Sequence, residues 1–300
     1  MRIVSLLPAA TEIVAFLGAT EHLVGITHEC DFPSVVASRA RVTKSAIPRS
    51  SDPAEIDAAV REQSGEGHAL FTMDERLIAA LHPTLMLTQE LCDVCAVRES
   101  DVRTLASKLQ GSPPVITLGG TTIEGILADV RMVADALAVP DEGEELLAGL
   151  RNRMRRIHDT LKSERAPRPR VALIEWTNPV YLAGHWGPEQ IQRAGGRDVA
   201  GTAGAHSVAV RLESVASTDP EIVLIAPCGY NLAHAKAEAM ELLKDPNWSW
   251  LAGRQVWALD ANGLVSRPGP RVVEGIETMA RIFNPTLFSA IDPVHAVRVA

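Results

Sequence analysis

Four cysteines are the residues of this sequence with the clearest capacity for chemistry: Cys30, Cys92, Cys95 and Cys228. Cys92 and Cys95 form a CxxC pair. Four thiolates can hold a zinc ion tetrahedrally or an iron–sulfur cluster, so all four cysteines are candidate metal ligands. A redox dithiol at the CxxC pair is a second interpretation, and cysteines that serve as small buried residues are a third. Residue types and spacing alone leave the three open.

Each cysteine also follows a predicted strand closely. Cys30 comes after residues 23–27, the CxxC pair after residues 85–89, and Cys228 after residues 222–226. Ligands of parallel α/β sheets gather beyond the carboxyl ends of the strands. We therefore expect all four cysteines near such an edge, where they could converge on a metal ion or cluster. The buried-residue and redox-dithiol interpretations stay open beside this one.

His28 stands two residues before Cys30. Because a neutral imidazole is a common metal ligand, His28 is a further candidate ligand of this site, or an axial donor to the cobalt of a corrinoid. A surface loop in which Asp31 caps the following turn is the alternative for this segment.

Composition and charge narrow the class of protein. The chain has 300 residues, of which 46% are hydrophobic and 22% charged, and its formal net charge is −8. These values are typical of a globular protein, and the negative charge argues against a nucleic-acid partner. A basic run at residues 151–156 falls in a helical pattern and reads as a solvated face.

The first residues, MRIVSLLPAATE, have a shorter apolar run than a secretory signal and lead directly into a proline and a charged helix. No segment has the roughly 18 consecutive apolar residues of a transmembrane helix. We therefore expect no transmembrane segment and a cytoplasmic location, unless a leader has been removed.

Strand patterns alternate with helical patterns through both halves of the chain, which predicts parallel sheets covered by helices. In the first half we expect strands at 2–7, 23–27, 85–89 and 115–118, and helices at 11–17, 53–62, 74–81, 100–109 and 122–137. In the second half we expect strands at 170–177, 222–226 and 255–259, and helices at 189–194, 212–217, 233–243 and 271–283. Asp52 is the expected N-cap of the helix that begins at Pro53.

A single long helix is predicted between the two halves. Residues 142–164 place apolar side chains three and four positions apart on one face, and Pro167 and Pro169 stop the pattern. The predicted fold class is therefore α/β, with two lobes of mainly parallel sheets joined by a long backbone helix. We expect lobes at 1–140 and 167–300, the connecting helix at 141–166, and a ligand cleft between the lobes.

Several blocks of the sequence match, in order, those of a known family. Among them are IVSLLPAATEIVAFLGA (3–19), LVGITHECDFP (23–33), RVALIEWTNPVYLAGHWGPEQIQRAGG (170–196) and SRPGPRVVEGIETM (266–279). The chain resembles the class III periplasmic binding proteins of ABC importers, the helical-backbone metal receptors, and especially their vitamin B12-binding branch. The resemblance implies a ligand cleft between two lobes and a corrinoid such as cobalamin, or another metal chelate, as the ligand. The cysteines, a polar insertion at 48–67 and the lack of a recognisable secretory signal depart from the family pattern.

An aromatic and imidazole cluster follows the first strand of the second half: Trp176, Tyr181, His185 and Trp186. Aromatic residues make up only 4% of the chain, so this concentration stands out. The resemblance implies that these residues line the ligand cleft and pack on the macrocycle of cobalamin. Core packing is the alternative for Trp176, whereas Trp186 reads as a loop residue.

Four further positions carry expectations. By the same resemblance, Pro8 and Ala9 occupy the cleft loop of the first lobe, where small residues permit close approach of a ligand. Arg267 could pair with an anionic group of the ligand, and a surface role is the equal alternative. Trp248, in NWSWLAG, is expected in a short packing helix.

The common catalytic motifs, among them GxxxxGK, GxSxG and HExxH, do not occur in the sequence. Gly119 and Gly120 precede a predicted helix and could cradle an anion at its N-terminus. We therefore expect a binding protein for a corrinoid or another metal chelate rather than an enzyme. The alternative is a cytosolic metalloprotein or metalloenzyme with a four-cysteine iron–sulfur or zinc site in the cleft.

Overall fold

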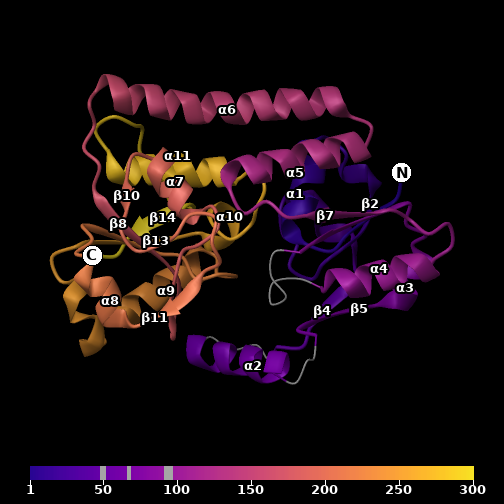
Figure 1. Cartoon of the computed structure of the whole chain (residues 1–300), viewed down its shortest axis with the longest axis horizontal. Coiled ribbons are helices and arrows are strands. Elements are labelled where there is room, and N and C mark those ends of the chain that lie inside the picture. The colour runs from indigo at the N-terminus through magenta and orange to yellow at the C-terminus, as the bar shows by residue number, and fades with distance from the viewer. Residues whose placement is uncertain (48–51, 66–68, 91–96) are drawn as a thin grey trace. The chain divides into compact units, whose positions relative to one another are not determined.

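The structure is a computed structural model, and it describes residues 1–47, 52–65, 69–90 and 97–300 (Figure 1). The chain divides into two compact units. Unit 1 comprises Met1–Gly120 and Glu124–Ala148, and unit 2 comprises Thr121–Ile123 and Gly149–Ala300. The division falls inside the long helix α6 (Pro140–Ser163), so this helix contributes to both units.

Unit 1 is built on a parallel sheet with the strand order β3-β2-β1-β6-β7. The strands are β1 (Ile3–Ser5), β2 (Leu23–Ile26), β3 (Ala40–Arg41), β6 (Leu85–Gln89) and β7 (Val115–Leu118). The helices are α1 (Pro8–Phe16), α2 (Pro53–Gly65), α3 (Glu75–Ala80), α4 (Glu99–Lys108) and α5 (Ile123–Ala136), with short 3-10 helices at Thr20–His22 and Ser34–Ser38. A separate antiparallel pair is formed by β4 (Thr43–Ser45) and β5 (Phe71–Met73). All five residues of β6 are buried, as expected for a central strand covered on both faces.

Helix α1 begins three residues earlier than the sequence pattern predicts. Its first residue is Pro8, because the fixed φ of proline suits the first helical position and its missing N–H would have no partner there. Pro8 and Ala9 therefore form the first turn of a helix, and the prediction that they form a loop is wrong.

Two helices of unit 1 begin at aspartate caps. The Asp52 carboxylate accepts the N–H of Ala54 at 2.8 Å, which confirms the predicted cap of α2. The Asp74 carboxylate accepts the N–H of Leu77 at 3.0 Å and caps α3.

We expect Asp74→Ala to lower the free energy of unfolding by about 1 kcal/mol, because an amide N–H of α3 loses its partner. Urea unfolding followed by circular dichroism measures this change. Asp74→Asn keeps an acceptor and should retain most of the stability, whereas Arg76→Ala, on the exposed surface of α3, is the neutral control. Equal losses in the alanine and asparagine variants would contradict a capping role.

Unit 2 contains a mixed sheet with the order β11-β9-β8-β12-β13-β14, and β10 also pairs with β8. The parallel centre consists of β8 (Arg170–Thr177), β12 (Ile222–Ile225) and β13 (Gln255–Leu259). Antiparallel strands flank it: β9 (Val180–Leu182), β11 (Val208–Val210) and β14 (Ala296–Arg298); β10 (Arg197–Asp198) runs parallel to β8. The helices are α7 (Gly187–Arg193), α8 (Leu212–Ser217), α9 (Leu232–Leu242), α10 (Ala261–Leu264) and α11 (Val272–Phe283). The predicted α/β class, with two units and a long helix, is confirmed.

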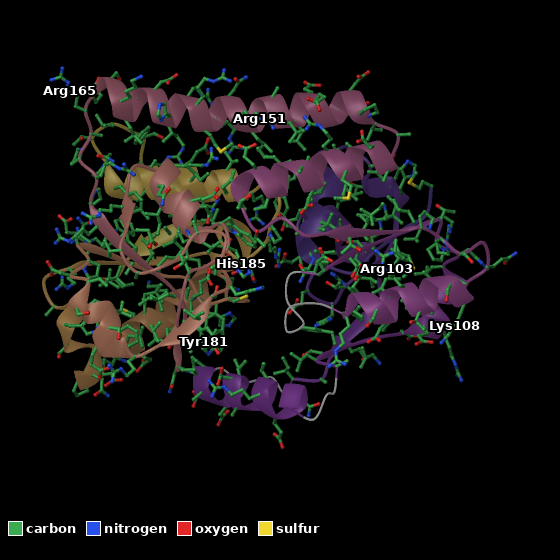
Figure 2. All side chains as sticks on the ribbon, viewed as in Figure 1. Arg103, Lys108, Arg151, Arg165, Tyr181 and His185 are labelled. Carbon is green, nitrogen blue, oxygen red and sulfur yellow. The ribbon has the colours of Figure 1, made fainter. Side chains whose placement is uncertain are left out.

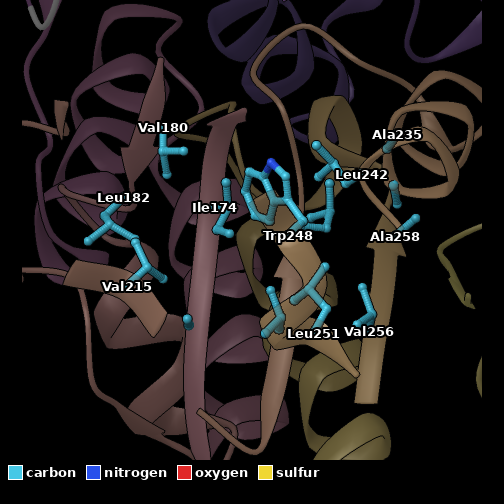
Figure 3. Packing of buried hydrophobic residues seen from close by; sticks show 14 residues of the cluster. Ile174, Val180, Leu182, Val215, Ala235, Leu242, Trp248, Leu251, Val256 and Ala258 are labelled. Carbon is cyan, nitrogen blue, oxygen red and sulfur yellow. The ribbon is translucent and has the colours of Figure 1, made fainter. Parts of the chain in front are cut away.

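One face of the sheet of unit 2 carries a continuous apolar core. Figure 3 shows Trp248 among buried side chains that include Ile174, Leu242 and Leu251. Trp248 is 4% exposed and lies in the 3-10 helix Pro246–Leu251, which confirms the predicted short packing helix. This core fixes the carboxyl ends of β8 and β12, where the candidate site begins.

Among the helices in the described part of the chain, none is both long enough and apolar enough to cross a bilayer.

Candidate functional site

Four rings form a row at the carboxyl ends of β8 and β12 in unit 2. Trp176 of β8 and Tyr181 of β9 are cross-strand partners, and the ring of Tyr230 meets the ring of Trp176 edge-on, with centroids 5.7 Å apart. His234, in the first turn of α9, lies next to Tyr230 at 5.9 Å. We call Tyr181, Trp176, Tyr230 and His234 the aromatic row. It contains both tyrosines of the chain, and Trp176, Tyr181 and Tyr230 are each partly exposed.

His185 lies just beyond β9 and belongs to the same region of unit 2 (Figure 2). Its backbone is left-handed, with φ of 47°, a conformation that costs energy for any residue other than glycine. The N–H of His185 donates to the Ala205 carbonyl at 2.6 Å, and its carbonyl accepts the N–H of Gly204 at 2.8 Å. These bonds join the His185 loop to the loop before β11 and bring His206 close to His185, with Nε2 of His185 3.2 Å from Nδ1 of His206.

A carboxyl group supports these two loops from β8. Glu175 accepts hydrogen bonds from the Ser207 hydroxyl and from the Gly184 N–H. Burial raises the pKa of Glu175 to about 7, although both hydrogen bonds favour the ionised form. Burial also lowers the pKa of His185, and the neighbouring His206 lowers it further. Close to neutral pH, the neutral form of His185 is therefore favoured.

Trp186 does not belong to this exposed surface. It is 7% exposed, and its indole N–H donates to the Val265 carbonyl at 2.6 Å. The structure corrects the expectation of a ligand-facing loop residue, because Trp186 immediately precedes α7 and anchors the segment after α10.

Arg267 is 9% exposed and lies between α10 and α11. The alternative of a surface role is therefore wrong. Its pairing with an anionic ligand stays a prediction.

A small hollow lies among residues that follow the strands of unit 1. The hollow, of about 10 Å³, is lined by residues that include Pro8, His28, Thr43 and Phe71, which is room for about one water molecule. His28 is exposed, its Nδ1 lies 2.8 Å from the Thr43 hydroxyl, and its ring lies 5.5 Å from that of Phe71. Ala9 is only 1% exposed, so its side chain offers almost no surface to a ligand.

Cys30 is enclosed in unit 1. It is 1% exposed, and its Sγ lies 3.1 Å from the hydroxyl oxygens of both Thr11 and Thr27. This environment favours the interpretation of Cys30 as a small buried residue over that of a metal ligand.

Of the other three cysteines, the structure describes only Cys228. Cys228 is exposed in unit 2, and its backbone N–H donates to the Glu175 carbonyl at 2.9 Å. Cys92 and Cys95 lie outside the described residues. Within the described ranges, no three histidine, cysteine, aspartate or glutamate side chains are grouped so that they could hold a metal ion.

The predicted anion cradle at Gly119 and Gly120 is occupied by the protein itself. The carboxylate of Asp129, on α5, accepts the N–H of Gly120 at 2.9 Å and that of Gly119 at 3.4 Å. An external anion would have to displace this carboxylate.

A larger cavity of about 450 Å³ lies elsewhere in unit 2. It is lined by residues of the first turns of α9, by Asp260 and by the segment before and within β14, and no member of the aromatic row lines it. Asp260 pairs with Arg271 at 3.6 Å. We place the candidate site at the aromatic row, because its partly exposed rings can recognise a ligand, whereas this cavity has a mainly aliphatic wall.

Four residues of the site were missed from the sequence: Tyr230, His234, Glu175 and His206. Tyr230 follows β12, so the strand-end rule that singled out Cys228 could have found it. Glu175 interrupts an apolar strand, which is a signal of a buried functional carboxyl group. His206 has no local signal, because only the pairing of two loops brings it to His185.

Comparisons with known proteins agree with this architecture. A family model described as "Periplasmic binding protein" matches residues 3–255. No curated protein gives a significant match. A periplasmic heme-binding protein from Pseudomonas aeruginosa aligns with a TM-score of 0.74 and 22% identity over 100% of this chain and 98% of its own.

Two further solved structures show the same fold. RhuT, a periplasmic heme-binding protein from Roseiflexus sp. RS-1, aligns with a TM-score of 0.69 and 22% identity over 96% of this chain and 99% of its own. The vitamin B12-binding protein BtuF of Vibrio cholerae aligns with a TM-score of 0.67 and 20% identity over 95% of this chain and 96% of its own. Together with the match of the family model over most of the sequence, these alignments confirm the resemblance: the chain belongs to the periplasmic binding protein family.

Proposed function

We propose that this protein binds a metal chelate with a flat macrocycle, and that a corrinoid such as cobalamin is its ligand. The observation that carries the proposal is the aromatic row of Tyr181, Trp176, Tyr230 and His234. Similar proteins described as binding heme or vitamin B12 support the ligand class.

The physical argument rests on shape and polarity. A macrocycle presents a broad apolar face with polar substituents at its rim, and partly exposed tyrosine and tryptophan rings offer apolar area on which such a face can pack. In a chain with only 4% aromatic residues, a row containing both tyrosines is a marked concentration at one strand edge. Binding sites in open α/β folds lie at such carboxyl ends.

Calorimetric titration with cyanocobalamin, and separately with hemin, tests the proposal. We expect saturable one-to-one binding of at least one of the two, with tighter binding of the corrinoid. Replacing Tyr230 with leucine should weaken this binding about tenfold, because each aromatic contact contributes about 0.5–1.5 kcal/mol beyond its buried area.

Trp257→Leu is the matched control, since Trp257 is a partly exposed aromatic residue of β13 outside the aromatic row. Its binding should be unchanged. If neither compound binds at high micromolar concentration, the macrocycle is excluded as ligand. Unchanged binding by both Tyr230→Leu and Trp176→Leu would place the site elsewhere.

A further inference from the structure

The two imidazole rings of His185 and His206 meet in a geometry that suits a shared metal ion. Their facing nitrogens, Nε2 of His185 and Nδ1 of His206, are 3.2 Å apart. Two histidine nitrogens bound tetrahedrally at 2.0–2.1 Å from one zinc ion would be about 3.3 Å apart. The ring centroids are 5.1 Å apart and the ring planes are at 89°. If the two rings lay on one straight line with this distance between their nitrogens, their centroids would be further apart than observed. The rings are therefore inclined to each other, as two ligands of one ion would be.

The backbone fixes this geometry before any ion binds. Two hydrogen bonds pair the His185 loop with Gly204 and Ala205, as described above. A Cβ atom on Gly184 would lie only 2.4 Å from the Ala205 carbonyl oxygen, so the two loops can approach this closely only with glycine at position 184. Ser207, the residue after His206, is tied to Glu175 through its hydroxyl. Both histidines are thus positioned by bonds that do not depend on their own side chains.

His185 is also held in a costly conformation. A left-handed backbone at a histidine is a strain that folded proteins keep mainly where the surroundings enforce it, commonly at functional sites.

We infer that His185 and His206 together bind a divalent transition-metal ion, such as Cu²⁺, Ni²⁺ or Zn²⁺. Imidazole nitrogen is a suitable ligand for all three. Because the described residues supply no third side chain, water or a small chelator completes the coordination. The proton that lies between the two nitrogens in the metal-free pair moves to the other nitrogen of its own ring, so both rings stay neutral.

This site differs from the proposed macrocycle site in what it can hold. A heme or corrin ring occupies the four in-plane positions of its metal and leaves one axial position on each face. Two nitrogens 3.2 Å apart on one side cannot both reach that metal. The pair requires an ion with two adjacent open positions, so the inference goes beyond the proposed function and does not depend on it.

Calorimetric titration of the untagged full-length chain with NiCl₂ and ZnCl₂, after treatment with EDTA, tests the inference. The titrated protein also carries the substitutions Cys92→Ser, Cys95→Ser and Cys228→Ser, so that these thiolates cannot compete for the metal ion. We expect one metal ion per chain. With Cu²⁺ we expect the tightest binding of the three ions, following their general order of affinity, and an electron paramagnetic resonance spectrum with two nitrogen donors.

His206→Ala should weaken Ni²⁺ binding by at least about 10–100-fold, since even loss of a group that only orients a ligand has an effect of this size. His185→Gly should weaken it equally while leaving thermal stability unchanged or higher, because glycine tolerates the left-handed backbone. Weaker Ni²⁺ binding together with undiminished thermal stability distinguishes a metal ligand from a residue with a merely structural role.

His158→Ala is the matched control: it removes an exposed histidine of α6 in unit 2 that belongs neither to the pair nor to the aromatic row, and it should leave Ni²⁺ binding unchanged. The inference is overturned if His206→Ala binds Ni²⁺ as tightly as the parent, if His158→Ala weakens binding as much as His206→Ala, or if the parent binds no Ni²⁺ below millimolar concentration. In each of these cases the contact between the two rings is an imidazole–imidazole hydrogen bond only. Cyanocobalamin binding by His206→Ala is measured in parallel. It shows whether loss of the metal site leaves macrocycle binding intact, so that the two proposals are tested independently.

Discussion

Replacing Trp248 with alanine is expected to lower the free energy of unfolding of unit 2 by about 3–5 kcal/mol, the usual cost of removing a large buried aromatic side chain. Trp248 is 4% exposed and belongs to the core cluster against the sheet of unit 2 (Figure 3). The cavity left behind would be bordered by strands and helices that are fixed by other contacts, so the site cannot collapse fully. Urea unfolding followed by far-ultraviolet circular dichroism measures the loss.

Trp250 provides the comparison for this prediction. It lies in the same 3-10 helix and stacks on Trp248 with centroids 5.9 Å apart, but it is partly exposed. Trp250→Ala should therefore have a clearly smaller effect, because less apolar area leaves contact with protein. Equal losses in the two variants would mean that the stacking pair, rather than the burial of Trp248, supplies the stability.

The central elements of both units could be predicted from the sequence because their burial leaves a local pattern. Strands β6, β7, β8 and β13 have the predicted limits, as does helix α8. Central parallel strands are covered on both faces and appear as short apolar runs between polar segments. The heptad-like spacing of apolar residues likewise identified the long helix α6, within two residues at each end.

The short flanking strands could not be predicted in this way. Strands β9, β11 and β14 have three residues each, and none of them is buried along its whole length. Their pairing depends on tertiary contacts: β11 pairs with β9 antiparallel, although more than 20 residues separate the two in sequence. A local pattern of three residues contains too little information to predict such a strand.

In the candidate site, the sequence likewise predicted where a residue lies in the fold better than it predicted the orientation of its side chain. The concentration of aromatic residues after one strand, together with the family resemblance, located Trp176, Tyr181 and His185 near one another, but residue type alone did not show which way a ring points. Trp186 is buried because it precedes α7 and donates a hydrogen bond to Val265. Cys30 likewise follows its strand as predicted, yet it is buried and its sulfur lies against two hydroxyl groups.

Stability should also depend on pH through Glu175, and this is the second large effect expected. Burial raises the pKa of its carboxyl group from the ordinary value of 4.5 to about 7. Below pH 4.5 the group is protonated in the folded and the unfolded chain, so its contribution to stability is fully present. As the pH rises from 4.5 through 7, the unfolded chain ionises first and the contribution is lost. The pKa difference corresponds to a loss on the order of 3 kcal/mol.

Glu175→Gln should remove this dependence, because glutamine is neutral at every pH and can still accept a hydrogen bond. Urea unfolding at pH 4.5, 6 and 8 should show the variant gaining stability relative to the parent as the pH rises. Ser207→Ala should act in the opposite direction. The Ser207 hydroxyl bond holds the pKa of Glu175 down, so its loss raises that pKa further and makes the loss of stability with rising pH steeper.

Ser207→Ala also frees the loop that carries His206, so it should weaken Ni²⁺ binding. Glu175→Gln keeps an acceptor for the Ser207 hydroxyl, so it should weaken Ni²⁺ binding less. Parallel pH profiles for the parent and Glu175→Gln would contradict a buried, protonated Glu175 beneath the two histidines.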